Sequence, residues 1–377
     1  MARKSALPIA IFTGNRSEYG LLKDLIRRVE LDDRFELQLI VSGSHLSESQ
    51  GKSVQEIEAD GIKSKATIEL SLDKNPQPSM AFLAAEVLSR ISETLAILKP
   101  RFLIVLGDRY ETFAAAAAAH LTGIEVIHLH GGETTDGAID DKLRHAITQL
   151  STWHFTAAEK YREKVICMGH SAEKVFNIGP MAIDQLKNKK DVSRSNFEAL
   201  TGYDFGENNL LVTYHSETLA ADKGLTGCNA LLKALERIEC NILFTHPNPD
   251  EGGDLILERI CEFREAYPHR SFVIPSLGSR LYIPALYLFD VMVGNSSSGI
   301  IEAPITGLPV VNIGDRQSGR LRYGNVVDAK ADSEDIFFKV NSCLTLDQQK
   351  TRKDSFKSFK SPAGEIMRWL IRKTMDI

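Results

Sequence analysis

The chain has 377 residues, of which 43% are hydrophobic and 25% charged, so it is long enough to bury a large core and is expected to form two domains of ordinary size. Its formal net charge of -5 argues against broad attraction to nucleic acid or to an anionic membrane, so a bound phosphate has to be held by local groups. The five cysteines are odd in number and include no C-x-x-C pair, which argues against a disulfide framework and against a thiolate zinc site.

The N-terminal segment carries little targeting information. Arg3 and Lys4 are its basic residues, and the apolar stretch 7–12 is much shorter than a signal sequence core or a membrane span. We therefore expect a cytoplasmic protein.

The first half of the chain alternates apolar runs with longer segments of helical character. The runs that end in small or polar residues are 8–12, 36–41, 102–106 and 125–129. The alanine run 114–119 lies between two of them, and its high helix propensity and small side chains suit a helix packed closely on a sheet. This alternation predicts a parallel sheet covered by helices on both faces.

The pattern starts again after the polar stretch 186–195. The strand candidates of this second series are 209–214, 240–244, 270–274, 291–293 and 309–313. We therefore expect two α/β domains, at 1–182 and 190–360, that face each other across a cleft. Open α/β sheets bind ligands outside the carboxyl ends of their strands, so residues at the strand ends are the candidates for function.

Two strand ends in the first half combine glycine with charged residues. Gly14 and Arg16 lie directly between the first strand and the first helix, where a helix N-terminus can hold phosphate. Arg16 is equally well explained as a solvated charge. At the second strand end, Asp108 and Arg109 follow an entirely apolar run, and the alternative to a ligand role for Asp108 is an N-cap of the alanine helix.

The densest cluster begins at the end of run 125–129. His128 and His130 are two residues apart, so they share one face if the strand continues, and Glu133 and Asp140 follow closely. No third metal ligand stands in a tight local signature such as H-E-x-x-H, so general acid and base chemistry is the better interpretation.

A structural interpretation of the same cluster also stands. Asp140 and Asp141 suit the first turn of a helix, where the dipole favours acidic residues, and Arg144 is then their surface partner.

In the second half, three successive serines at 296–298 follow an apolar strand. Their hydroxyls and backbone amides form a candidate diphosphate cradle without a lysine, and a purely structural serine and glycine turn is the alternative. Glu302 follows one helical turn later, within reach of ribose hydroxyls. His215 and Asn248 stand at two further strand ends.

Taken together, these motifs resemble the UDP-N-acetylglucosamine 2-epimerase family, and within it the hydrolysing branch of sialic and legionaminic acid biosynthesis. They occur in family order and are Gly14-x-Arg16, Gly107-Asp108-Arg109, His128-x-x-Gly131-Gly132-Glu133, Ile139-Asp140-Asp141-x-x-Arg144-His145, Gly294-Asn295-Ser296-Ser297 and Gly314-x-Arg316-Gln317-x-x-Arg320. The resemblance implies two Rossmann-like domains in a glycosyltransferase-B-like arrangement, with a C-terminal helix at about 362–377 that returns to the first domain. It also implies a homodimer or homotetramer that uses no cofactor.

The resemblance further implies roles for individual residues. The catalytic candidates on the sugar side are Asp108, Asp140, Glu133 and His130. The candidates for binding UDP are Arg16, Arg109, His215, Asn248, Ser296, Ser297, Glu302 and Arg316.

The implied reaction releases UDP from a UDP-sugar through a glycal and inverts C2. The implied substrate is UDP-N-acetylglucosamine, giving N-acetylmannosamine, or UDP-2,4-diacetamido-2,4,6-trideoxyglucose. His130 stands where the sialic-acid enzymes usually have glutamate, which favours the second sugar.

Three other functions fit the same pattern. A glycosyltransferase of the same architecture needs an acceptor, since fold does not determine function. A non-hydrolysing epimerase leaves the sugar attached to UDP, and a sugar-nucleotide-binding regulator performs no chemistry.

Overall fold

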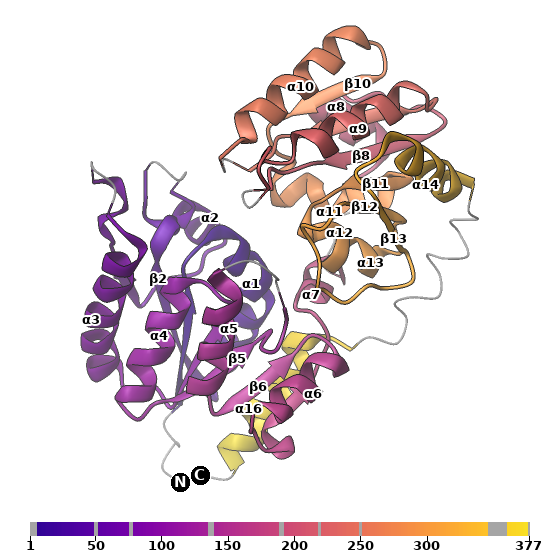
Figure 1. Cartoon of the computed structure of the whole chain (residues 1–377). Coiled ribbons are helices and arrows are strands. Elements are labelled where there is room, and N and C mark those ends of the chain that lie inside the picture. The colour runs from indigo at the N-terminus through magenta and orange to yellow at the C-terminus, as the bar shows by residue number, and fades with distance from the viewer. Residues whose placement is uncertain are drawn as a thin grey trace. The chain divides into compact units, whose positions relative to one another are not determined.

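The computed structural model describes residues 6–48, 52–74, 78–134, 139–187, 192–217, 220–248, 251–345 and 360–375. The chain divides into two units (Figure 1). Unit 1 comprises Met1–Thr134, Ala138–Gln185 and Lys360–Ile377, and unit 2 comprises Thr135–Gly137 and Leu186–Phe359.

Unit 1 contains a parallel sheet of seven strands in the order β3-β2-β1-β4-β5-β6-β7. The strands are β1 (Leu7–Thr13), β2 (Phe35–Ser42), β3 (Ala66–Ile68), β4 (Phe102–Leu106), β5 (Glu125–Leu129), β6 (Trp153–Thr156) and β7 (Val175–Asn177). The four runs predicted in this half form β1, β2, β4 and β5. Strands β3, β6 and β7, which have three or four residues each, were not predicted.

The helices of unit 1 cover both faces of its sheet. They are α1 (Arg16–Glu30), α2 (Val54–Ala59), α3 (Met80–Leu98), α4 (Tyr110–Leu121), α5 (Ile139–Leu150), α6 (Glu159–Cys167), α7 (Ala182–Lys187) and α16 (Pro362–Met375). Alternate residues of β1 point to opposite faces: Ile9 and Ile11 join the core beneath α1 and α16, whereas Ala10 and Phe12 join the core beneath α3 and α4. Burial on both faces explains why β1 reads as an unbroken apolar run.

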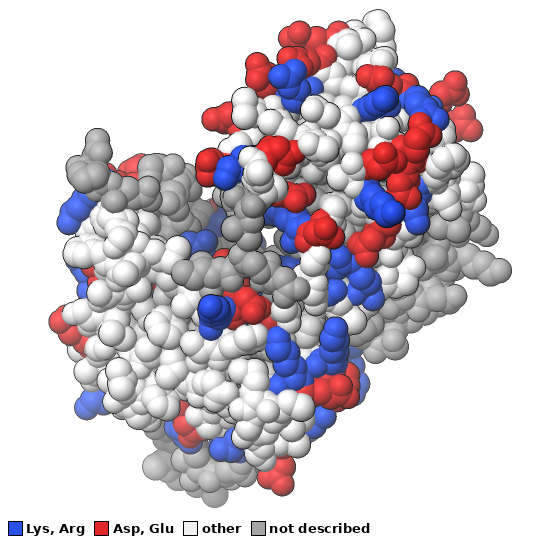
Figure 2. All heavy atoms as spheres, viewed as in Figure 1, with Lys and Arg blue, Asp and Glu red and all other residues white. Residues whose placement is uncertain are grey.

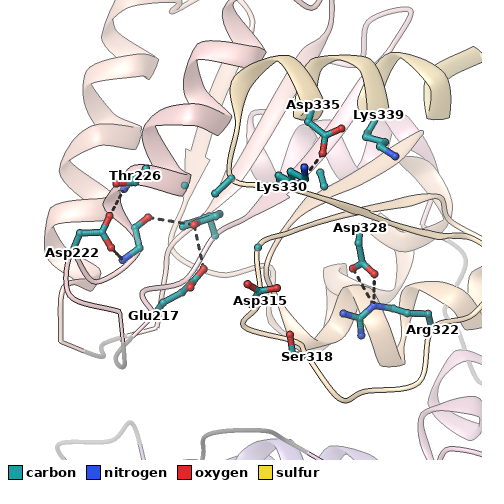
Figure 3. Close-up of a pocket in the computed structure, with 16 residues that line it drawn as sticks. Glu217, Asp222, Thr226, Asp315, Ser318, Arg322, Asp328, Lys330, Asp335 and Lys339 are labelled. Atoms are coloured by element: carbon teal, nitrogen blue, oxygen red, sulfur yellow. Dashed lines mark hydrogen bonds and ion pairs between the residues drawn. The ribbon is translucent and has the colours of Figure 1, made fainter.

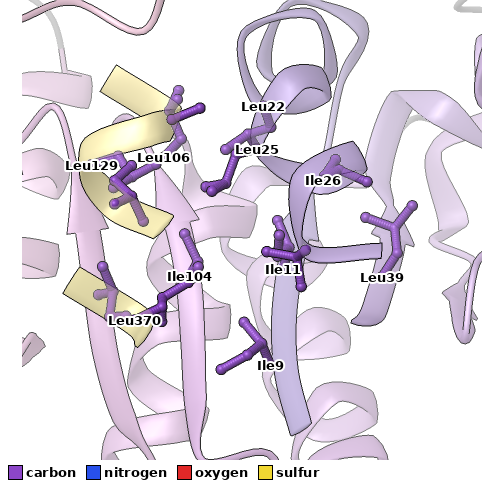
Figure 4. Close-up of a cluster of buried hydrophobic side chains, with 14 of the residues drawn as sticks. Ile9, Ile11, Leu22, Leu25, Ile26, Leu39, Ile104, Leu106, Leu129 and Leu370 are labelled. Atoms are coloured by element: carbon purple, nitrogen blue, oxygen red, sulfur yellow. The ribbon is translucent and has the colours of Figure 1, made fainter. Parts of the chain in front are cut away.

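The last helix of the chain completes unit 1. Figure 4 shows Leu370 of α16 in the same apolar cluster as Ile9, Ile104 and Leu129. The first turn of α16 is fixed by a hydrogen bond from the Ala363 backbone N–H to the Asp184 carboxylate, at 2.7 Å and across 179 residues of sequence.

Unit 2 contains a parallel sheet of six strands in the order β10-β9-β8-β11-β12-β13. The strands are β8 (Asn209–Thr213), β9 (Asn241–Thr245), β10 (Ser271–Ile274), β11 (Val291–Gly294), β12 (Val310–Ile313) and β13 (Val326–Ala329). The helices are α8 (Arg194–Thr201), α9 (Leu225–Glu236), α10 (Gly253–Ala266), α11 (Gly278–Leu288), α12 (Ser297–Ile301), α13 (Ala303–Thr306) and α14 (Ser333–Thr345). The five predicted strands are all present, and β13 was missed.

The two parallel sheets confirm the predicted α/β class. On the face shown in Figure 2, basic and acidic side chains are interspersed, in keeping with the near-balanced composition. None of the helices within the described ranges combines the length and the apolar character needed to cross a bilayer.

The packing of α16 generates a test of its contribution to unit 1. We expect Leu370→Ala to lower the free energy of unfolding by about 2–5 kcal/mol, because it removes a fully buried side chain and leaves a cavity. Urea denaturation followed by circular dichroism measures the change. Met375→Ala in the same helix is the control, and it should change stability by less than about 0.5 kcal/mol because Met375 is 76% exposed. Equal stability of the two variants would contradict the packing described.

Candidate active site

The strand ends of β1, β4 and β5 lie side by side in the sheet of unit 1. The parallel register pairs Ile11 with Ile104 and Leu106 with Leu129, so the three loops that follow these strands leave the same edge. These loops contain Gly14, Asp108 and His130, which were predicted from three separate segments of sequence.

The first loop is held by the start of α1. The Asn15 side chain caps the helix by accepting a hydrogen bond from the Glu18 backbone N–H at 3.0 Å. The Glu18 carboxylate turns back and accepts from the Gly14 N–H at 2.7 Å. Burial raises the pKa of Glu18 to about 7, and the charges of Glu111 and Asp108 act in the same direction. Glu18 was not predicted as a site residue, although an acid three residues after an N-cap is a recognisable signal.

Arg16 and Arg109 each contact a glutamate within unit 1. Arg16 forms an ion pair with Glu56 at 2.8 Å, and about half of its side chain is exposed. Arg109 binds the buried Glu111 carboxylate through Nε at 3.1 Å and Nη2 at 2.9 Å, which fixes the direction of its guanidinium.

Asp108 is not the cap of the alanine helix. The residue at the N-cap position of α4 is Arg109, which makes no side-chain capping bond. Asp108 instead accepts a hydrogen bond from Arg144 Nη2. The capping alternative for Asp108 is therefore wrong, because the guanidinium of Arg144 takes the carboxylate away from the helix end.

Arg144 is not a surface residue either. Its side chain is buried, at 6% exposed. Its Nη1 donates to the His130 carbonyl at 2.9 Å and lies 3.4 Å from Glu133 Oε2. The interpretation of Arg144 as a surface partner of Asp140 and Asp141 is wrong, since α5 turns Arg144 toward the loop after β5.

Asp140 occupies the first turn of α5. Burial raises the pKa of its carboxyl group, and the charge of Asp108 raises it further, while Arg109 and Arg144 act in the opposite direction. A carboxyl group that holds its proton more readily than usual, beside a second acid, has the properties of a proton-transfer group.

His128 and His130 do not share a face. Strand β5 ends at Leu129, and His130 has a left-handed backbone with φ of 64°. His128 Nε2 bonds the Gly107 carbonyl at 2.9 Å and Nδ1 lies 3.2 Å from the Thr148 hydroxyl, and burial lowers the pKa of His128 to about 3. His128 is therefore a neutral structural residue. The His130 ring instead contacts Glu133, with Nδ1 at 3.0 Å from Oε1.

Unit 2 presents a second polar cluster, which is organised by Asn295. Gly294 has φ of 139° and approaches Thr213 so closely that a Cβ would lie 1.9 Å from its carbonyl oxygen, so only glycine fits. The fully buried Asn295 side chain accepts from the His215 N–H at 2.7 Å and donates to the His215 carbonyl at 2.9 Å. The ends of β8 and β11 are thereby joined.

The loop after β12 is attached to the same residue. Gln317 Nε2 donates to the Asn295 carbonyl at 2.9 Å, and Arg316 Nη1 donates to it at 3.2 Å. Asn295 and Gln317 lie within the family motifs, but sequence reasoning gave neither of them a role.

His215 is held as a neutral ring. Burial lowers its pKa to about 4, and the charge of Arg316 adds to this effect. Nδ1 accepts a hydrogen bond from the Asn248 backbone N–H at 3.0 Å, so the proton of the neutral ring is on Nε2. His215 Nε2 is therefore a hydrogen-bond donor, which suits a phosphate oxygen.

The predicted serine cradle begins α12. Ser296 is its N-cap, and its hydroxyl lies 3.1 Å from the Ser298 hydroxyl, while Ser297 is the first helical residue. Glu302 ends the helix, and burial raises its pKa to about 7, an effect that the Tyr282 hydroxyl partly offsets.

A cavity of about 610 Å³ lies in unit 2 at the ends of β8, β12 and β13 (Figure 3). Several of its polar side chains already have partners: Arg322 pairs with Asp328 at 3.0 Å, and Asp335 accepts from the Lys330 N–H at 2.8 Å. The residues predicted to bind UDP are not among those that line it.

Within each unit, the structure therefore brings several predicted residues together. In unit 1, Asp108, Glu133 and His130 meet around Arg144, whereas Arg16 is paired separately with Glu56. In unit 2, His215 and Arg316 bond Asn295, and Asn248 bonds the His215 ring. Ser296, Ser297 and Glu302 follow Asn295 along α12.

Two parallel α/β sheets with polar groups at their strand ends define a glycosyltransferase-B-like enzyme fold. The structure of UDP-GlcNAc 2-epimerase from Neisseria meningitidis is similar, with a TM-score of 0.80 at 17% identity, covering 97% of this chain and 100% of that one. A glycosyltransferase from Rickettsia africae has a TM-score of 0.62 at 13% identity, covering 98% and 99%. Similarity at these identities shows the fold alone, and it confirms the predicted glycosyltransferase-B-like fold class.

Sequence comparison gives the family. The model of the family described as UDP-N-acetylglucosamine 2-epimerase matches residues 27–364. The GDP/UDP-N,N'-diacetylbacillosamine 2-epimerase (hydrolyzing) of Campylobacter jejuni is 35% identical, over 89% of this chain and 87% of that protein. The UDP-N,N'-diacetylbacillosamine 2-epimerase (hydrolyzing) of Legionella pneumophila is also 35% identical, over 89% and 88%. The chain belongs to the UDP-N-acetylglucosamine 2-epimerase family, and the predicted enzyme type, a hydrolysing UDP-sugar 2-epimerase, is confirmed.

The buried Glu18 generates a prediction about pH. Its folded-state pKa of about 7 lies above the ordinary value of 4.5, so its protonated form stabilises the fold below pH 4.5, and this contribution is lost as the pH rises toward 7. Glutamine does not ionise. We therefore expect Glu18→Gln to gain stability relative to the parent chain by up to about 3 kcal/mol between pH 4.5 and pH 8.

Urea denaturation at the two pH values measures this difference. Glu30→Gln, at an exposed position of the same helix, is the matched control and should give a difference that does not change with pH. A constant difference for Glu18→Gln as well would contradict the buried, protonated state.

Proposed function

We propose that this enzyme removes UDP from UDP-2,4-diacetamido-2,4,6-trideoxyglucose, which is UDP-N,N'-diacetylbacillosamine, and releases the free sugar with C2 inverted. The observation that carries the reaction is the partly buried acidic cluster of unit 1, in which Asp108 is bound by Arg144 and Asp140 has a raised pKa. Two hydrolysing relatives named for this sugar, each 35% identical over 89% of the chain, support the substrate. Formation of a homodimer or homotetramer and a role in nonulosonic acid biosynthesis belong to the same proposal.

The chemistry requires two proton-transfer groups. The C2 proton of an acetamido sugar has no adjacent ring carbonyl, so it becomes acidic only as the C1–O bond to the diphosphate breaks and C1 gains positive charge. Loss of UDP and of this proton gives a glycal. Water then adds across the double bond of the glycal: its oxygen bonds C1 and gives up one proton to solvent, and a proton returns to C2 from the opposite face, which inverts that centre.

We assign the two roles to Asp108 and Asp140. Asp108 acts as the proton acceptor, because Arg144 holds its carboxylate in one orientation with a charge-assisted hydrogen bond. Asp140 acts as the donor, because burial and the charge of Asp108 both favour its protonated form. Glu133 shares Arg144 with Asp108, and its negative charge favours the positive charge that develops at C1.

The UDP half of the substrate is assigned to groups that donate hydrogen bonds. In unit 2 these are His215 Nε2, the hydroxyls of Ser296 and Ser297, and the Arg316 guanidinium, with Asn248 holding the His215 ring. Glu302 accepts from the ribose hydroxyls. Arg16 and Arg109 of unit 1 add positive charge that favours departure of the diphosphate.

The function is tested by isotope labelling. UDP-N,N'-diacetylbacillosamine and UDP-N-acetylglucosamine are assayed side by side in deuterated water, with mass spectrometry and NMR of the released sugar. We expect UDP release, deuterium at C2 and inverted configuration, with higher kcat/KM for the diacetamido sugar. Released sugar without deuterium at C2 rules out the epimerase mechanism, and sugar that remains attached to UDP indicates the non-hydrolysing reaction.

Catalysis and UDP binding are assigned to different residues, so substitutions should separate them. We expect Asp140→Asn to lower kcat by about 10²–10⁴-fold and to leave the Kd for UDP within about twofold, because it removes a proton donor and no UDP contact. Arg316→Ala should weaken UDP binding about 10- to 100-fold, because it removes charge-assisted hydrogen bonds. Calorimetry with UDP and the turnover assay measure the two effects, with Ser297→Ala as a second UDP-site variant. Unchanged UDP affinity in both UDP-site variants would contradict the assignment.

A further inference from the structure

Every polar group of His130 has a partner in unit 1. Its backbone N–H donates to the Phe155 carbonyl at 2.9 Å, and its carbonyl accepts from Arg144 at 2.9 Å. In the ring, Nδ1 lies 3.0 Å from Glu133 Oε1, and Nε2 lies 3.0 Å from the Met181 backbone nitrogen. His130 thus joins β6, α5, its own loop and the segment before α7.

The partners determine the protonation of the ring. A backbone amide only donates, so Nε2 has to be the unprotonated acceptor of the Met181 N–H. The neutral ring then carries its proton on Nδ1, which donates to the Glu133 carboxylate. In this state both nitrogens are used within the protein. The ring can exchange a proton with a substrate only by giving up one of these two bonds.

The backbone conformation of His130 is unusual as well. A left-handed conformation at a residue other than glycine costs about 1–2 kcal/mol, so it persists where the surroundings require it. The side chain is 7% exposed, so the ring is enclosed by its partners.

Met181 ties this loop to the place where the chain leaves unit 1. Met181 is fully buried and immediately precedes α7, and unit 1 ends within α7 at Gln185. The other end of the connection is Glu133, which shares Arg144 with Asp108. The His130 ring therefore lies between Met181, in the segment that leads into α7 (the exit segment), and the acidic cluster around Arg144.

We propose that His130 is a positioning residue that uses one fixed neutral tautomer to hold Glu133, and through Arg144 also Asp108, against the exit segment at Met181. It replaces the general acid or base role that its place in the motif predicts. This inference rests on the proposed function, because the acidic cluster that it positions is the one assigned to proton transfer.

The tautomer is tested directly by NMR. In protein labelled with ¹⁵N-histidine, the ring signals that disappear in His130→Gln and persist in the control His120→Gln belong to His130; His120 is exposed on α4. We expect a protonated Nδ1 and an unprotonated Nε2 at neutral pH. A ring protonated on Nε2, or on both nitrogens, would overturn the proposal.

The kinetic test separates positioning from proton transfer. Glutamine offers both an acceptor and a donor but does not titrate, so His130→Gln should lower kcat by less than about tenfold and keep the shape of the pH profile. His130→Ala should lower kcat by about 100-fold with little change in KM, because Glu133 loses its donor. If His130→Gln loses one limb of the pH profile and its turnover falls as far as that of His130→Ala, the ring is an acid or base and the proposal is overturned.

The two readouts distinguish failure of this inference from failure of the proposed function. If the parent chain releases no UDP from either sugar, the proposed function fails, and the NMR result still decides whether His130 has the fixed tautomer. If His130→Ala does not fold, His130→Gln and the labelled parent chain carry the test.

Discussion

A buried positive charge organises the acidic loops of unit 1. Removing a guanidinium from water costs several kcal/mol unless hydrogen bonds and opposite charges replace the hydration. Arg144 meets this requirement with the Asp108 carboxylate, the Glu133 carboxylate and the His130 carbonyl. Because these three groups come from two different loops, satisfying one side chain fixes the relative position of both loops at the edge of the sheet.

Unit 2 solves the corresponding problem without a buried charge. The amide of Asn295 is both donor and acceptor toward the His215 backbone, and its own carbonyl receives Arg316 and Gln317. A neutral amide carries a much smaller desolvation cost than an ion, so unit 2 holds three strand ends together without burying a charge at their centre. The two units thus reach ordered strand ends by different physical means.

Sequence reasoning succeeded where a pattern is repeated and failed where a side chain finds a distant partner. The apolar runs predicted nine strands, most of which are largely buried, whereas β3, β6, β7 and β13 were missed. The motifs named the residues around Arg144 and Asn295, and the family that they indicated is the one to which the chain belongs.

The side-chain contacts inside the two polar clusters could not be predicted from neighbouring residues in the sequence. Asp108 looked like a helix cap because its neighbours in sequence form a helix, but it binds Arg144, 36 residues away. His128 and His130 looked like a pair because a strand has period two, but the strand stops between them and the backbone of His130 turns left-handed. In both cases a long-range hydrogen bond outweighed the local preference.

The return of α16 has a consequence for biosynthesis. Its apolar face belongs to the core formed by β1, β4 and β5, yet it is made about 230 residues after β5, counting from Leu129 to Pro362. The ribosome therefore has to add more than 230 residues after β5 before the first unit is closed. Until then, the surface that includes Ile104 and Leu129 lacks its last cover, and transiently exposed apolar surface of this kind favours aggregation.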